Sequence, residues 1–451
     1  KAVVFGTTIL GSNPSAPARQ MKIFFLKNKL VNQIKKLFFP FYRSKEIVKI
    51  FKLLENGQEK NKKVAMFVGG CVRNHLLGKD IDDIDIATVF TPEEIKEKFK
   101  NSEVKVLETG LKHGSVTLLI NKSKFEITTL RQDVKSYGRH ADVDFTEDWN
   151  IDSTRRDFTI NSIYLDKKGN IFDPQNGVQD LKNGRIKFIG DPEKRIKEDY
   201  LRIIRFIRFS LQYNDLNLDH RTLEAIKLNL NGIKNLSKER ILNELFKIFS
   251  LNNFENIIKQ EQLKNIFLVI FPEFKFLERL NKINFLENYR ILKLEIDLIL
   301  AILLINESNN FEYFSHKYKT SNDLKNKLIF FAENYKKYKS DKNYFKKNLK
   351  KNIYFFGKEK VKKFATFIFF EDKKLSFKEF LKTIDNIDNT SVPKFPYDGQ
   401  FLINKGMSEG KKLGKALREL EEVWVNNNYS ISEKNLHAVI NKVKKSDVFD
   451  I

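Results

Sequence analysis

The stretch Phe67–Thr88 reads FVGGCVRNHLLGKDIDDIDIAT, and the order of its apolar, glycine and acidic residues decides the fold. Short apolar runs predict strands, and glycines beside them predict turns or helix ends. The expected elements are, in order, a strand at Val64–Val68, a turn at Gly69–Gly70, a helix at Val72–Leu77 ended by Gly78, and a strand at Ile81–Ala87.

Further elements follow this stretch. The sequence Thr91-Pro92-Glu93-Glu94 is a capping box with proline at the first helical position, and it predicts a helix to about Lys100. Alternating residues predict strands at Ser115–Ile120 and Lys124–Leu130. Beyond Tyr200, apolar residues recur at helical spacing, so the second half is expected to be all-helical.

Two aspartates, Asp83 and Asp85, lie two positions apart in the second predicted strand. Because side chains alternate between the faces of a strand, both carboxylates are expected on one face, with Ile84 and Ile86 on the other. Adjacent carboxylates are costly unless a cation neutralises them, and hard oxygen ligands suit Mg²⁺ carrying the phosphates of a nucleotide. A solvated strand end is the alternative interpretation.

The glycine turn before the first helix is suited to phosphate. Gly69 and Gly70 let the backbone approach a phosphate closely, and the helix N-terminus and the Arg73 guanidinium both favour its charge. An ordinary tight turn would need the same glycines. The order of strand, glycines, arginine and paired aspartates resembles the nucleotidyltransferase head of the DNA polymerase β superfamily.

Four ordered motifs narrow this resemblance. They are FVGGCVRNHLLGKDIDDIDIAT at Phe67–Thr88, RRDFTINS at Arg155–Ser162, DPQNGVQDL at Asp173–Leu181 and EDYLRIIR at Glu198–Arg205. Together they resemble the class II tRNA nucleotidyltransferase and poly(A) polymerase family. The resemblance implies an α+β fold, in which a DNA polymerase β-like nucleotidyltransferase head precedes an all-helical neck, body and tail.

The resemblance also predicts four domains. The expected parts are an N-terminal leader and helix at 1–44, the head at 45–182, a neck for nucleotide-base selection at 183–265, and a body and tail for tRNA binding at 266–451. Two origins are open for residues 1–20, which are either upstream of a functional start at Met21 or part of an organelle presequence.

Roles carry over to the residues that match the motifs. Asp83 and Asp85 are the expected catalytic metal ligands, and Glu126, between the inward-facing Phe125 and Ile127, is the candidate for a third carboxylate. This chain has Asn74 where the family has Asp, and an amide there can still accept a hydrogen bond. The expected nucleotide-binding residues are Gly69, Gly70, Arg73, Arg156, Asp157, Asn161, Asp199, Arg202 and Arg205.

The fourth motif is expected to select the base. Asp191 and Pro192 predict the start of a helix that places Asp199 and Arg202 three positions apart on one face, where an exposed ion pair is the alternative. By resemblance, this carboxylate and guanidinium read the Watson–Crick edge of cytosine or adenine, each of which has an amino donor beside a ring-nitrogen acceptor. Uracil and guanine present the reverse pattern and would leave buried polar groups unpaired.

The second motif is expected to hold the sugar. From the residues alone, its charged trio of Arg155, Arg156 and Asp157 is a helix start with ion pairs. By resemblance, Asp157 and Asn161 help to hold the ribose and the arginines face phosphate, so ribonucleotides are preferred over deoxyribonucleotides.

Two segments favour tRNA over other RNA substrates. Tyr137–Phe145, YGRHADVDF, resembles the flexible loop that accompanies the switch from C to A addition, with Gly138, Arg139 and His140 as matching residues. The glycines of DGQFLINKGMSEGKKLG at 398–414 resemble a tail segment of bacterial CCA enzymes, and turns between helices explain them equally well.

The expected activity is therefore Mg²⁺-dependent addition of C, C and A to the 3′ end of tRNA from CTP and ATP. A poly(A) polymerase or a partial CC- or A-adding enzyme is one alternative. A catalytically silent RNA-binding protein is the other.

Composition is consistent with this reading. The 451 residues include 82 Lys and Arg against 58 Asp and Glu, a net charge of +24 that favours a polyanionic partner such as the tRNA acceptor arm. The single cysteine, Cys71, excludes an internal disulfide and suits a reducing compartment. No apolar run approaches the roughly 20 residues of a membrane span. A cytoplasmic, bacterial enzyme is expected, with an organelle as the alternative compartment.

Overall fold

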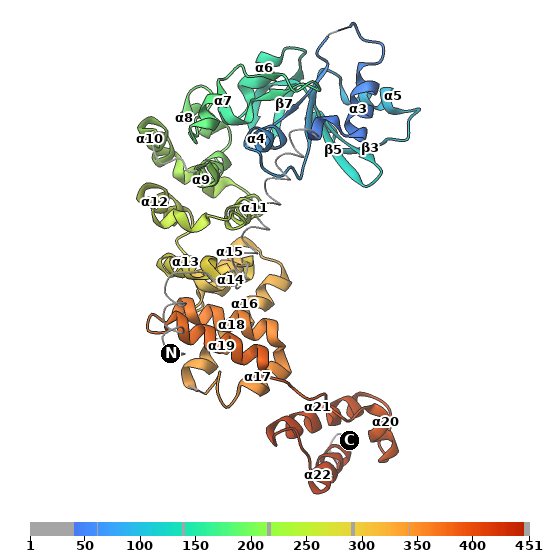
Figure 1. Cartoon of the computed structure of the whole chain (residues 1–451), viewed down its shortest axis with the longest axis vertical. Coiled ribbons are helices and arrows are strands. Elements are labelled where there is room, and N and C mark those ends of the chain that lie inside the picture. The colour runs from blue at the N-terminus through green and yellow to red at the C-terminus, as the bar shows by residue number, and fades with distance from the viewer. Residues whose placement is uncertain are drawn as a thin grey trace, which may run out of the picture. The chain divides into compact units, whose positions relative to one another are not determined.

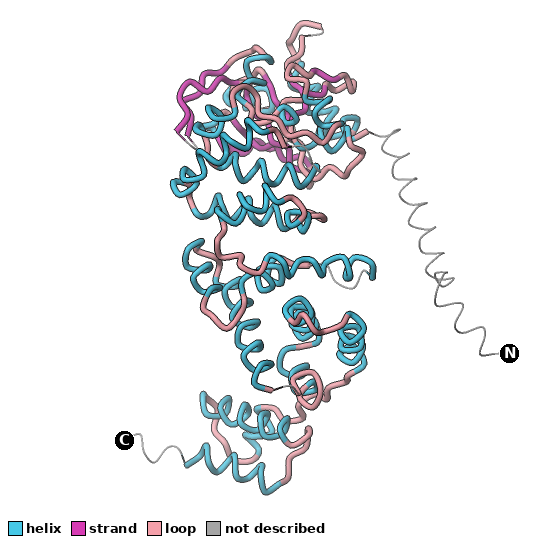
Figure 2. The backbone as a smooth tube through the Cα atoms, turned by 90° about the vertical axis from the view of Figure 1, so that its left-hand side faces the viewer, coloured by secondary structure: helices cyan, strands magenta, loops and turns pink. Residues whose placement is uncertain are grey.

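The computed structural model describes residues 40–60, 62–137, 140–213, 218–289, 294–341 and 343–445. They form two compact units, one ending at Ile270 and the other beginning at Phe271 (Figure 1). The strands gather in the first unit, and helices make up the described elements of the second (Figure 2). This composition confirms the predicted α+β class. The predicted head and neck both lie in the first unit, so their boundary stays a prediction.

A seven-stranded mixed sheet organises the first unit, in the order β3-β4-β5-β2-β1-β8-β9. Strand β1 (Ala65–Val68) pairs antiparallel with β2 (Asp85–Thr88), which pairs parallel with β5 (Ser123–Thr129). All four residues of β1 are buried, as a continuous apolar run in the middle of a sheet requires. The remaining strands are β3 (Lys105–Gly110), β4 (Ser115–Ile120), β8 (Tyr164–Leu165) and β9 (Ile171–Phe172), and a separate sheet pairs β6 (Arg131–Tyr137) with β7 (His140–Phe145).

The second strand is shorter than the sequence predicts. It begins at Asp85 rather than Ile81, so Asp83 lies in the loop before it. Asp82 and Asp83 are exposed, and aspartate is depleted in strands because it keeps its hydration better in a loop. The prediction that side chains alternate between the two faces of the strand therefore applies to Asp85 and the buried Ile86. It does not apply to Asp83, which lies before the strand.

Helices surround the sheet and continue beyond it in the first unit. The capping box at Thr91 is formed as predicted, since Glu94 N donates to Thr91 Oγ1 and Thr91 N donates to Glu94 Oε2. The helical elements are η1 (Phe41–Arg43), α3 (Lys45–Glu55), α4 (Gly70–Leu76), α5 (Pro92–Phe99), η2 (Leu111–His113), α6 (Trp149–Arg155), η3 (Thr159–Asn161), α7 (Gly177–Lys182), α8 (Pro192–Glu198), α9 (Leu201–Tyr213), α10 (His220–Asn229), η4 (Leu230–Asn235), α11 (Lys238–Phe249), η5 (Phe254–Ile258) and α12 (Glu261–Ile270).

The glycine of the third motif permits a close backbone contact. A Cβ added to Gly177 would lie 2.1 Å from the carbonyl oxygen of Thr159, in the segment that carries the second motif.

Replacing Gly177 by Ala is expected to lower the free energy of unfolding by about 2 to 3 kcal/mol, because a rigid backbone must shift. Denaturant unfolding measures this difference in the free energy of unfolding. The control is Gly414→Ala, whose added Cβ would meet no atom within 4 Å and which should leave stability equal or higher.

The second unit has its core in apolar helices. The longest strongly apolar stretch forms α14 (Ile296–Leu304), in which Leu298–Leu304 are at most 1% exposed. Among the described residues, no helix has both the length and the apolar character needed to cross a membrane. The other elements are η6 (Leu277–Lys282), α13 (Ile283–Tyr289), α15 (Asn310–Tyr318), α16 (Asn322–Ser340), α17 (Leu349–Phe356), α18 (Lys358–Glu371), α19 (Phe377–Asn389), α20 (Gly399–Asn404), α21 (Lys411–Asn426) and α22 (Glu433–Lys445).

Candidate functional site

One cavity in the first unit collects residues from three of the four motifs. Its volume is about 660 Å³, and nine arginine and lysine side chains and five aspartates line it, so its charge favours an anion. All the predicted catalytic and nucleotide-binding residues except the candidate Glu126 lie on its wall. These are Gly69, Gly70, Arg73, Asp83, Asp85, Arg156, Asp157, Asn161, Asp199, Arg202 and Arg205.

The glycine turn and Asp85 lie against each other. Gly69 has a φ of +77°, and a Cβ added to it would lie 3.4 Å from Asp85 Oδ2. Burial and the nearby Glu126 raise the pKa of Asp85 to about 6, with a smaller contribution from Asp83. A carboxyl group with this environment gains from a bound cation, which would neutralise the crowded negative charge.

Glu126 lies on β5 directly beside Asp85 of β2 in the parallel register. Phe125 and Ile127 are buried, as predicted, and Glu126 is exposed. Glu126 does not line the cavity, and no three metal-ligating side chains converge within the described ranges. Its role as a third metal ligand stays a prediction.

The second motif forms a hydrogen-bonded chain on the cavity wall. Asn161 Nδ2 donates to Asp157 Oδ1 at 2.6 Å, and Arg205 Nε donates to Asp157 Oδ2 at 2.7 Å. Burial disfavours the charged form of Asp157, but Arg205 and the Asn161 hydrogen bond outweigh it and hold the pKa of this carboxyl well below its usual range. Asp157 is therefore an ionised hydrogen-bond acceptor at neutral pH.

A residue that sequence reasoning missed supports the arginines. Asp152 of α6 is fully buried and accepts hydrogen bonds from Arg155 Nε at 2.7 Å, Arg156 Nη2 at 2.9 Å and Tyr164 Oη at 2.7 Å. Its position three and four residues before the arginines is the helical ion-pair spacing, which was available in the sequence. This carboxylate fixes Arg156 at the wall of the cavity.

Replacing Asp152 by Ala is expected to lower the free energy of unfolding at neutral pH by about 3 to 5 kcal/mol, because it leaves buried guanidinium groups unpaired. Burial opposes ionisation of Asp152, but Arg156 and Arg155 hold its pKa well below the usual range. Its contribution is therefore present above the unfolded pKa of about 3.9 and is lost as the pH falls below that value.

Denaturant unfolding at pH 7 and at acid pH measures both parts of this prediction. The control is Asp148→Asn, at the exposed N-cap of the same helix, because Asn caps a helix about as well as Asp. Equal stability of the Asp152→Ala variant and the unchanged protein would contradict the structural role of Asp152.

The fourth motif does not lie on one helix, so that prediction is wrong. Helix α8 ends at Glu198, Asp199 is extended with φ −154° and ψ 106°, and α9 begins at Leu201. The Asp199 carboxylate contacts residues of α9 and α11. Leu201 N donates to its Oδ1 at 3.2 Å, and Arg240 Nη2 donates to its Oδ2 at 2.7 Å.

The alternative interpretation, an ion pair between Asp199 and Arg202, is absent from the ion pairs of the described residues. Arg202 Nη1 instead donates to Glu198 Oε2 and to the carbonyl oxygen of Arg195. Arg240, which sequence reasoning missed, therefore contacts the carboxylate that is predicted to read the base. No local spacing could have indicated it, since it lies 41 positions after Asp199.

Asn74 has a structural partner where the family has Asp. Its Nδ2 donates to the carbonyl oxygen of Asp80 at 2.7 Å, and this bond ties α4 to the loop that leads to Asp83. An ionised Asp cannot donate this hydrogen bond. The amide at this position thus supports the acidic loop rather than contributing charge to it.

The predicted flexible loop is only partly covered. Gly138 and Arg139 lie outside the described residues, and His140 is the first residue of β7, opposite Tyr137 of β6. In the tail, Gly406 and Gly410 have positive φ, which is the conformation expected of turns between helices.

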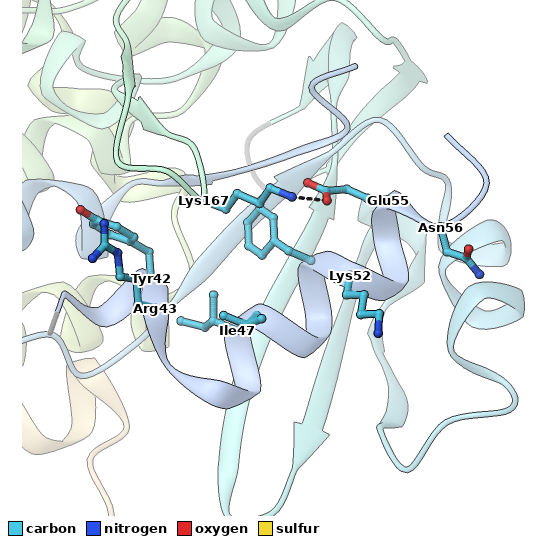
Figure 3. Close-up of a pocket in the computed structure, with 9 residues that line it drawn as sticks. Tyr42, Arg43, Ile47, Lys52, Glu55, Asn56 and Lys167 are labelled. Atoms are coloured by element: carbon cyan, nitrogen blue, oxygen red, sulfur yellow. Dashed lines mark hydrogen bonds and ion pairs between the residues drawn. The ribbon is translucent and has the colours of Figure 1, made fainter. Parts of the chain in front are cut away.

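A second cavity lies along α3 and contains none of the predicted residues. Its volume is about 440 Å³, and the buried Ile47 and Phe51 are among the residues that line it. An ion pair between Lys167 and Glu55 crosses one side of it (Figure 3). This cavity has neither paired carboxylates nor a glycine turn. It therefore lacks the groups that make the first cavity a candidate nucleotide site.

Two family models and a curated relative match this chain. The family model described as "Poly A polymerase head domain" matches residues 65–187, and that described as "Probable RNA and SrmB- binding site of polymerase A" matches residues 215–277. The mitochondrial CCA tRNA nucleotidyltransferase 1 of Mus musculus is 34% identical over 387 residues, covering 83% of this chain and 86% of its own length.

A bacterial relative and a solved structure are also similar to this chain over most of its length. The CCA-adding enzyme of Streptococcus uberis is 29% identical over 393 residues, covering 84% of this chain and 92% of its own. The crystal structure of the Bacillus stearothermophilus CCA-adding enzyme in complex with CTP has a TM-score of 0.65 at 22% identity, covering 89% of this chain and 97% of that one. At this identity the structural likeness establishes a shared fold.

Proposed function

The chain belongs to the CCA tRNA nucleotidyltransferase family, and we propose that it adds C, C and A to the 3′ end of tRNA from CTP and ATP without a nucleic-acid template. The observation that carries the proposal is the single cavity in which the glycine turn, the paired aspartates and the fourth-motif residues meet. Binding of tRNA, CTP and ATP follows from the same family membership.

The residues present fit a divalent cation. Asp83 and Asp85 both line the cavity, and the raised pKa of Asp85 reflects burial first and then nearby negative charge, which Mg²⁺ would neutralise. These two carboxylates would hold the metal. When bound, Mg²⁺ would neutralise phosphate charge and make the attacking hydroxyl more acidic.

The chain's own groups position the reactants. The amides of the glycine turn and the Arg73 guanidinium bind the triphosphate, and Asp157 with Asn161 holds the ribose. The RNA 3′-hydroxyl can then attack the α-phosphate in line, with pyrophosphate as the leaving group. Positioning and charge complementarity supply the catalysis, and no protein nucleophile is required.

Base choice rests on a carboxylate and a guanidinium that lie on different elements. Asp199, held by Arg240, accepts from the amino group of cytosine or adenine, and Arg202 donates to the adjacent ring nitrogen. Uracil and guanine present an oxygen where the amino group should be. Discrimination on the order of 10⁴ is within reach of such a site.

The test is an addition assay with purified protein and tRNA transcripts that end before CCA. CTP and ATP are supplied singly and together. Three added residues, with the last dependent on ATP, support CCA addition. Long A tracts would indicate a poly(A) polymerase, one or two added residues a partial enzyme, and tRNA binding without product a silent RNA-binding protein.

The compartment is part of the same proposal. Bacterial relatives such as that of Streptococcus uberis support the bacterial cytoplasm. The vertebrate relatives named as mitochondrial support the organellar alternative. Detecting the protein in fractionated cells with an antibody would separate the two.

A further inference from the structure

Arg73 is held from two sides by helix α9. Its Nε donates to Tyr213 Oη at 2.9 Å, and its guanidinium carbon lies 5.1 Å from the centroid of the Phe209 ring. The Phe209 and Tyr213 rings are stacked, with centroids 6.1 Å apart and planes at 19°. Tyr213 is the last residue of α9 and lies outside all four motifs.

These contacts fix which edge of Arg73 is available to a ligand. Its Nη1 donates to Asn161 Oδ1, so Tyr213 and Asn161 use the Nε side and one terminal nitrogen. Nη2 lies beside the glycine turn, 3.9 Å from where a Cβ on Gly70 would be. Among the described residues, none accepts a hydrogen bond from Nη2.

A closed circuit of contacts links α4 to α9. Arg73 binds Asn161, Asn161 donates to Asp157, and Asp157 accepts from Arg205 of α9. Tyr213 closes the circuit from the far end of the same helix. The helix that carries Arg202 for base reading is thereby tied to the arginine beside the phosphate-binding turn.

We infer that Tyr213 is a positioning residue for the triphosphate, whose hydroxyl holds Arg73 with Nη2 directed at the glycine turn. The inference rests on the proposed function. A flexible arginine would lose conformational entropy each time it bound phosphate. An arginine already oriented by Tyr213 and Phe209 avoids most of that cost, so triphosphate binds more tightly.

The test is Tyr213→Phe in the full-length protein, which removes the hydroxyl and keeps the ring. Inhibition of CTP incorporation by inorganic tripolyphosphate, which has no base or sugar, reports on phosphate binding alone. The inhibition constant of tripolyphosphate and the KM of CTP and ATP are expected to rise together by about three- to tenfold, the effect of losing one typical hydrogen bond. The KM of tRNA should not change, and the Tm should fall by no more than about 4 °C.

A double-mutant cycle checks that Tyr213 acts through Arg73. In an Arg73→Lys background, Tyr213→Phe should cause no further rise in the tripolyphosphate constant, because Nε is gone. The matched control is Tyr344→Phe, which removes a hydroxyl that donates to Asn334 in the second unit and should leave that constant unchanged.

An unchanged tripolyphosphate inhibition constant in the Tyr213→Phe variant overturns the inference. A further three- to tenfold rise in that constant when Tyr213→Phe is added to Arg73→Lys overturns it as well. Either result leaves the proposed function standing if the unchanged protein adds CCA. Failure of the unchanged protein to add nucleotides is the separate result that removes the proposed function itself.

Discussion

Replacing Asp85 by Asn is expected to lower the rate of CCA addition by about a thousandfold or more, and Asp83→Asn should have an effect of similar size. Each change removes one negative charge from the site proposed for Mg²⁺. Asparagine keeps the size of the side chain, so folding and tRNA affinity should stay within about twofold of the unchanged protein. Single-turnover addition of one C to a tRNA lacking CCA measures the rate, and filter binding measures the affinity.

The control for this prediction is Asp82→Asn on the same loop. Asp82 is exposed and also lines the cavity, but it has no assigned role. It should retain addition within about an order of magnitude, since only general charge is lost. An Asp82→Asn variant as inactive as Asp85→Asn would show that the charge of the loop, rather than the two proposed ligands, determines activity.

Replacing Asp199 by Ala is expected to relax base choice, lowering the discrimination against UTP and GTP by about 10² to 10³. The variant keeps Arg202 and Arg240, whose guanidinium groups only donate hydrogen bonds. Uracil O4 and guanine O6 accept hydrogen bonds, so the altered site no longer excludes them. Relative kcat/KM values for each NTP supplied alone, on tRNA transcripts lacking CCA, measure the change.

Asp191→Asn is the matched control for base choice. Asp191 caps the N-terminus of α8, the helix that ends next to Asp199, and it contacts Arg221. Asparagine preserves the cap, so selectivity for C and A should remain. If Asp199→Ala also kept full selectivity, the carboxylate would not read the base edge, and the cavity would have to exclude wrong bases by shape.

Much of the site could be predicted because its residues follow local rules. The apolar run before Gly69 formed the buried strand β1, and the capping box at Thr91 opened a helix. The motifs placed the correct residue types around one cavity. The errors came where two local tendencies compete, as at Asp83, where solvation of an acidic run prevented a longer strand, and at Asp199, where the helix ends.

The sequence by itself determined the family, the α+β class and the identities of the motif residues on the cavity wall. Only the tertiary structure decided which residues from distant parts of the chain contact them. Arg240 meets Asp199 from 41 positions away, and Tyr213 meets Arg73 from 140 positions away. Periodicity and capping report on neighbours within a few residues, because they arise from backbone geometry. Contacts between distant segments depend on how helices pack on the sheet and on one another, and no local pattern in a single sequence specifies that packing.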